Sequence, residues 1–98
     1  MYRVFRIASD RLPFIDALYQ DGLTGRQSIT VREARSLGLG GEGSLVLVEG
    51  SAEGVTRAET LLKDAAVVLT GADSESAYRA FQSQDAEAAT GLGFVFGG

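Results

Sequence analysis

SLVLVEGSAEGVTRAETLL, residues 44–62, contains a β-strand followed directly by an α-helix. The strand is the unbroken apolar run 45–48, which is typical of a central strand covered on both faces. Gly50 ends the strand, and the Ser51 side chain can cap the first turn of the helix. The helix carries an apolar stripe along one face, formed by Val55, Ala58, Leu61, Leu62 and Ala65. Such a strand-turn-helix unit is a building block of domains that mix the two kinds of element.

Similar units lie on both sides of this stretch. Residues 2–8 are rich in strand formers, and apolar spacing predicts a helix over residues 11–21 after them. Downstream, a strand over residues 66–69 precedes a helix that is capped by Asp73 or Ser74. The chain therefore repeats a pattern in which each strand ends in small or polar residues that start a helix.

The segment between the first two units has two interpretations. Alternation of apolar and polar residues favours a strand over residues 26–30. Thr30 and Glu33 have the spacing of a capping box, so we expect a helical turn or two over residues 31–37 to follow. Gly38 would stop that helix, with Leu39 packing back as in a Schellman motif.

The order of elements predicts an α+β fold in one domain, residues 1–98. We expect a ferredoxin-like split β-α-β sandwich with an extra C-terminal helix and a short strand over residues 94–96. In this fold we expect the first and third strands to be parallel neighbours. A small doubly wound α/β sheet is the alternative. Short helices and the brief connection over residues 22–30 favour the first.

Composition excludes several kinds of chemistry. The chain has no Cys and no His, which excludes disulfides, thiolate nucleophiles and a Ser-His-Asp triad. We expect no cofactor and no metal. The net charge of −4 argues against nucleic-acid binding, which needs a basic surplus. No apolar run reaches the roughly 18 residues of a membrane span, and Arg3 and Arg6 interrupt any signal-peptide core. We therefore expect a cytoplasmic protein that does not contact a membrane.

Two groups of polar residues are candidate ligand sites. Ser9 and Asp10 follow the first strand, and the run 49–51, Glu49-Gly50-Ser51, follows the third. If those strands are parallel neighbours, both groups meet at one rim of the sheet, where two helix starts would expose N–H groups to an anion. Helix capping alone would also explain the serines and Asp10. It explains Glu49 least, because a charge there directly follows the apolar run.

Arg32 and Arg35 form the second group. On a helix over residues 31–37 they would share one face and could bind a phosphate or carboxylate. Pairing with nearby acidic side chains is the alternative. The glycine-rich loop 38–43 matches G-x-G-x-x-G, but a strand follows it where a dinucleotide site needs a helix. We expect this loop to be a mobile connection or a flap over a ligand.

Two functions follow from these features. The first is a small non-enzymatic module that self-associates and binds a protein partner or a small anionic ligand at helix N-termini. The apolar segment 91–98, or a sheet edge or face, would mediate the self-association. The alternative is a small enzyme in which Asp10 and Glu49 act as acid and base.

Overall fold

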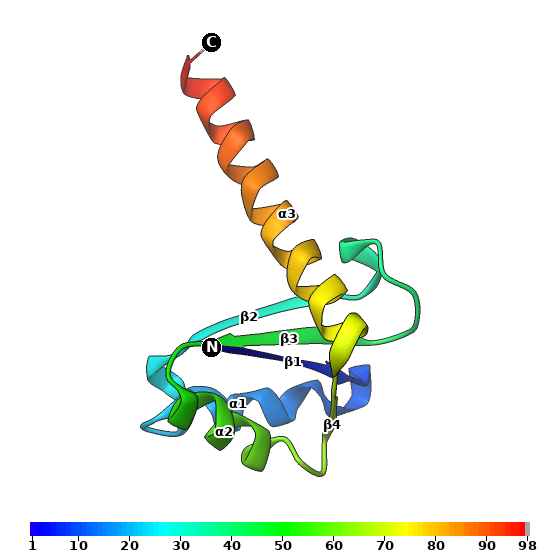
Figure 1. The fold of residues 1–98 in the computed structure, drawn as a ribbon, viewed down its shortest axis with the longest axis vertical. Coiled ribbons are helices and arrows are strands. Elements are labelled where there is room, and N and C mark those ends of the chain that lie inside the picture. The colour runs from blue at the N-terminus through cyan, green and yellow to red at the C-terminus, as the bar shows by residue number, and fades with distance from the viewer. Residues whose placement is uncertain (98) are drawn as a thin grey trace.

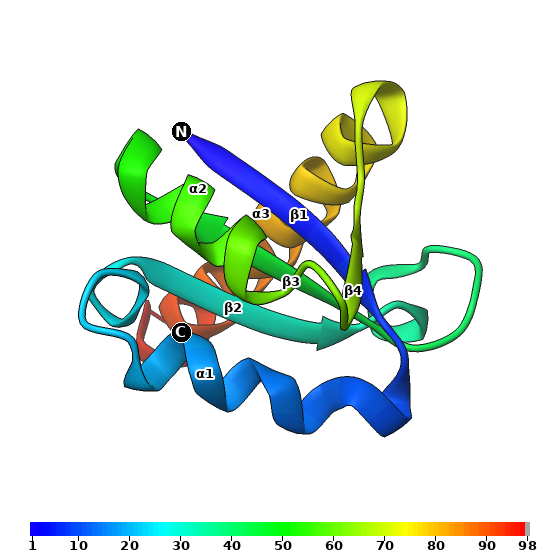
Figure 2. The same ribbon diagram turned by 90° about the horizontal axis from the view of Figure 1, so that it is seen from below.

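The computed structural model describes residues 1–97, with side chains described as far as Ala86. It is an α+β arrangement in which α1 and α2 cover one face of a sheet and α3 crosses the other (Figure 1, Figure 2). The strands are β1 (Tyr2–Ile7), β2 (Ser28–Glu33), β3 (Ser44–Glu49) and β4 (Ala66–Val68). The helices are α1 (Asp16–Gln20), α2 (Ala52–Leu61) and α3 (Gly71–Gly97), with 3-10 helices η1 (Ser9–Ile15), η2 (Thr24–Arg26) and η3 (Arg35–Leu37).

The four strands form an antiparallel sheet in the order β2-β3-β1-β4. Tyr2 of β1 pairs with Glu49 of β3, and Ile7 pairs with Ser44. The expectation that β1 and β3 are parallel neighbours is therefore wrong. A helical crossover does make β1 parallel to β2, but β3 lies between them and is antiparallel to both. In the same way, β1 lies between β3 and β4.

The main core lies between the sheet and the two helices α1 and α2. Alternate residues of the central strands face it, because side chains point to opposite faces at each step along a strand. The stripe predicted for α2 is part of this core through Val55 and Ala58, and Leu62 directly follows that helix. The buried members are Phe5, Ile7, Ile15, Leu18, Val46, Val48, Val55, Ala58 and Leu62.

A second core forms where α3 crosses the other face of the sheet. Ala77 and Phe81 of α3 pack on Val4 of β1 and on Leu45 and Leu47 of β3. Both faces of β3 are therefore buried, which confirms the prediction drawn from its unbroken apolar run.

Beyond its contact with the sheet, α3 leaves the body of the molecule (Figure 1). The last side-chain bond along the described part of α3 is the one that the Gln84 amide donates to the Ser36 carbonyl, at 2.7 Å. The predicted strand over residues 94–96 is wrong, because α3 includes these residues. A short apolar run does not distinguish strand from helix, and the Ala-rich segment 86–89 before it favours helix.

The segment between α1 and β3 is more extended than predicted. β2 reaches Glu33, so the helix expected over residues 31–37 is wrong, and only the single turn η3 remains. Residues 31–33 pair with β3 and form backbone hydrogen bonds along the ladder, so they extend the strand instead of starting a helix at a capping box. The predicted stop is confirmed, since Gly38 has φ +74° and the Leu39 N–H donates to the Ala34 carbonyl at 3.0 Å.

The end of α1 gives a prediction about pH. The Asp21 carboxylate accepts bonds from the Thr24 N–H at 3.1 Å and from the Arg57 guanidinium at 3.0 Å. These donors, with the Leu23 N–H, lower the pKa of Asp21 from 3.8 to about 2. A lowered pKa stabilises the fold above pH 3.8, and this contribution is lost as the pH falls toward about 2.

We therefore expect Asp21→Asn to lower the melting temperature at pH 7 and to have a smaller effect near pH 2. Thermal unfolding followed by circular dichroism from pH 7 to pH 2 measures this difference. Asp16→Asn is the control, because Asp16 is an exposed Asp of the same helix. A constant difference between Asp21→Asn and the unmodified protein at all pH values would contradict the prediction.

Candidate functional site

The predicted rim does not form, because its two halves lie at opposite ends of the sheet. Ser9 and Asp10 follow the end of β1 that pairs with Ser44. Glu49 pairs with Tyr2 at the other end. A strand advances by about 3.3 Å per residue, so most of the sheet's length separates the two groups. The prediction that Asp10 and Glu49 act together as acid and base is wrong for the same reason.

Protein atoms occupy part of the N-terminus of α2. The Ser51 hydroxyl accepts from the Gly54 N–H at 3.0 Å, which confirms the predicted cap. The Gln27 side-chain oxygen accepts from the Ser51 N–H at 3.0 Å, and its amide donates to the Leu23 carbonyl. A Cβ at Gly50 would collide with Gln27. Two of the amides at this helix end, those of Ser51 and Gly54, therefore have partners within the chain.

Glu49 connects the sheet to α3. It accepts a bond from the Tyr78 hydroxyl at 3.0 Å, and this bond raises the pKa of Tyr78. The Tyr2 and Tyr78 rings stack with centroids 3.9 Å apart and planes 8° apart. Helix capping did not explain the charge at Glu49. The bond to Tyr78 gives this charge a structural role, because it holds α3 against the sheet. The sequence does not signal this contact, because the two partners are 29 positions apart.

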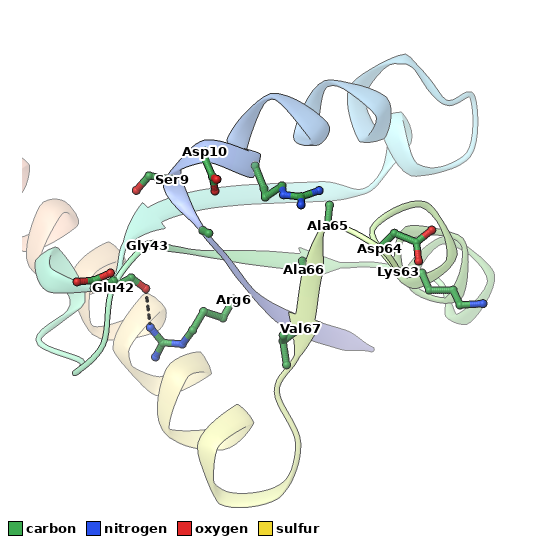
Figure 3. Close-up of a pocket in the computed structure, with 12 residues that line it drawn as sticks. Arg6, Ser9, Asp10, Glu42, Gly43, Lys63, Asp64, Ala65, Ala66 and Val67 are labelled. Carbon is green, nitrogen blue, oxygen red and sulfur yellow. Dashed lines mark hydrogen bonds between the residues drawn. The ribbon is translucent and has the colours of Figure 1, made fainter.

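Ser9 and Asp10 line a cavity of about 750 Å³ at the end of β1 (Figure 3). Neither caps η1, whose N-cap position is Ala8 without a side-chain bond. The charged side chains around the cavity balance in sign, which gives an anion no preference. The basic ones are Arg6, Arg11 and Lys63, and the acidic ones are Asp10, Glu42 and Asp64.

The glycine-rich loop forms one wall of this cavity, and it is held in place. The Arg6 guanidinium donates to the Glu42 carbonyl at 3.0 Å (Figure 3). It also donates to the Gly40 carbonyl at 3.0 Å. A Cβ at Gly41 would lie 2.7 Å from an Arg6 nitrogen. These contacts attach the loop, which was predicted to be a mobile connection or a flap, to β1. The sequence prediction missed Arg6 because it lies more than 30 positions before the loop.

Arg32 and Arg35 do not share a helix face. Arg32 is on β2, Arg35 begins η3, and both are exposed. The Arg32 guanidinium donates to the Val31 carbonyl at 2.8 Å. The shared helix face on which the predicted anion site depended is therefore absent. The Arg32 bond lies on the outer side of β2.

β2 is an edge strand, because β3 is its one neighbour in the sheet. Successive residues of a strand point their backbone groups to opposite sides. The Ala34 N–H donates to the Gly43 carbonyl at 3.0 Å and continues the β2–β3 ladder, so the even-numbered residues of β2 face β3. Ile29, Val31 and Glu33 therefore direct their backbone groups outward.

Side chains cover part of this outer edge. Arg32 covers the Val31 carbonyl, and the Ser36 hydroxyl donates to the Glu33 carbonyl at 2.9 Å. The Ile29 backbone groups and the Val31 N–H have no protein partner among the described residues. The alternation of apolar and polar residues around residue 30 indicates a strand with one polar face. It does not indicate that this strand lies at the edge of the sheet.

Comparisons with protein-family models, with curated proteins and with solved structures find no match to this chain. Within residues 1–97, no helix is long and apolar enough to cross a bilayer. Among the side chains described as far as Ala86, no group of three carboxylate, imidazole or thiol side chains could hold a metal ion. The outer edge of β2 has backbone groups without a protein partner among the described residues.

Proposed function

We propose that this chain is a small, non-enzymatic, cytoplasmic interaction module that self-associates through the outer edge of β2. We propose further that its scaffold is a ferredoxin-like split β-α-β sandwich, with α3 added over the second face. The strand order and the two interleaved crossovers support this scaffold. A protein partner that adds its own strand to the same edge is the second possibility.

The open edge carries the proposal. Unpaired N–H and C=O groups on an edge strand are a template for another strand. β2 contains six residues, whereas β4 at the opposite edge contains three. Proteins commonly protect an edge with Pro or with charged side chains, and in residues 28–33 the charged residues, Arg32 and Glu33, lie only at the end of the strand. Ile29 and Val31 are only half-buried, so an added strand would cover more of their apolar surface.

A small anion at helix N-termini has less support. The first turn of α2 is capped by Ser51 and Gln27. The cavity beside Ser9 and Asp10 has balanced charges. We therefore place the binding function at the β2 edge.

Thr30→Lys tests the proposal. Thr30 lies at the middle of β2, and a Lys there places a charge at the edge, as natural edge strands do to prevent pairing. We expect the unmodified protein to show a mass that rises with concentration in native mass spectrometry and sedimentation. We expect Thr30→Lys to weaken association by at least about tenfold, which corresponds to about 1.4 kcal/mol.

Thr56→Lys is the matched control, because it adds the same charge at an exposed position on α2. It should associate like the unmodified protein. An unmodified protein that stays monomeric at all concentrations would overturn the proposal. Equal weakening by both variants would also overturn it, because a general charge effect would then explain the loss.

A further inference from the structure

We infer that the strand added to β2 is the β2 strand of a second copy, antiparallel and related by a two-fold axis at Thr30. This inference rests on the proposed function and specifies its partner and register. The two strands would join two sheets into one. A two-fold axis perpendicular to the sheet keeps both α3 helices on one face and both copies of α1 and α2 on the other.

The outward backbone groups limit the possible registers. Residues whose backbone N–H and C=O groups point away from β3 must pair with residues of the second copy whose backbone groups also point away from its β3. An axis at Thr30 places Ile29 opposite Val31, and the two residues exchange N–H···O=C bonds twice by symmetry. The Ile29 groups and the Val31 N–H, which have no protein partner among the described residues, all gain one. The Arg32 guanidinium must leave the Val31 carbonyl for this ladder to form.

The side chains favour this register over those with the axis nearer the end of β2 at Glu33. With the axis at Thr30, Ile29 packs on Val31 of the second copy, Arg32 faces Ser28, and no like charges are opposed. An axis at Val31 would place Ile29 opposite Glu33. An axis at Arg32 would place two Arg32 side chains opposite each other, which destabilises a pair of strands.

Single introduced cysteines test the register, because the chain contains no Cys of its own with which they could form a disulfide. With the axis at Thr30, the two Thr30 residues form a non-hydrogen-bonded pair with Cα atoms about 4.5 Å apart. This separation lies within the roughly 4.4–6.8 Å that a disulfide spans. We expect most of a Thr30→Cys protein to become a disulfide-linked dimer in a glutathione redox buffer, at concentrations where the unmodified protein associates.

Ser28→Cys is the matched control. The two Ser28 residues would lie about 13 Å apart along the strands, too far for a disulfide. Ser28→Cys alone should remain unlinked, whereas a mixture of Ser28→Cys with Arg32→Cys should give a mixed disulfide. Non-reducing electrophoresis and mass spectrometry distinguish these products.

The outcomes separate the register from the proposed function. Equal linking of Thr30→Cys and Ser28→Cys, or no mixed product, would overturn the inference. If Thr30→Lys weakens association but Arg32→Cys links to itself, the edge is correct and the register is wrong. Absence of association in the unmodified protein would overturn both.

Discussion

Gly43→Ala should be among the most damaging single substitutions in this protein. Gly43 has φ +84°, and a left-handed conformation costs a residue with a Cβ about 1–2 kcal/mol of conformational free energy. The added Cβ would also collide with the Ile7 carbonyl of β1. Such overpacking costs about 1–3 kcal/mol more. The loop cannot shift freely, because the Gly43 carbonyl accepts the Ala34 N–H at 3.0 Å.

We therefore expect a loss of at least about 2 kcal/mol, which lowers the melting temperature of a domain this size by about 10 °C. Thermal and urea unfolding measure the loss. Gly40→Ala is the matched control in the same loop, since no atom lies within 4 Å of its Cβ position and its φ is not left-handed. It should change stability by less than about 0.5 kcal/mol. Equal effects at the two positions would mean that the loop is not fixed against β1.

The elements that the sequence predicted correctly depend on local interactions. β3 is identified by a continuous apolar run, and α2 by Ser51 and its apolar stripe. Gly38 ends its turn through bonds to residues at most five positions away. Each of these features lies within a few residues of its cause, so spacing and residue type are enough to predict it.

The relation between elements was not predictable in the same way. β1 and β3 are separated by more than 30 residues, and their direction depends on which strand fills the space between β1 and β2. The predicted rim site was wrong for the same reason, because it required Asp10 and Glu49 to lie close together. β2 was predicted too short, since its last residues gain their backbone bonds from β3 rather than from local contacts.

The contacts that decide the site are also long-range. Gln27 occupies the start of α2 from 24 positions away, and Arg6 holds the glycine-rich loop from a separate strand. Polar side chains such as these have no spacing rule that signals their partner. The same limit applies to the outer edge of β2, which is an edge because no strand among residues 1–97 lies beside it on that side.

Phe81→Ala should show that α3 is an integral layer of the domain. The Phe81 side chain is 3% exposed and packs on the face of the sheet opposite α1 and α2. Removing a buried Phe side chain costs about 3–5 kcal/mol, since transfer free energy is lost and a cavity remains. Domains are stable by about 5–15 kcal/mol, so this loss is a large fraction of the total.

Urea unfolding followed by far-ultraviolet circular dichroism measures this loss. Ser83→Ala is the control, because Ser83 is exposed on the same helix and Ala favours helix. It should change stability by less than about 0.5 kcal/mol. A cost below about 1 kcal/mol for Phe81→Ala would mean that α3 does not cover Val4, Leu45 and Leu47 in solution. The face beneath α3 would then compete with the β2 edge as the surface for self-association, since buried apolar side chains of both central strands would be open to a second copy.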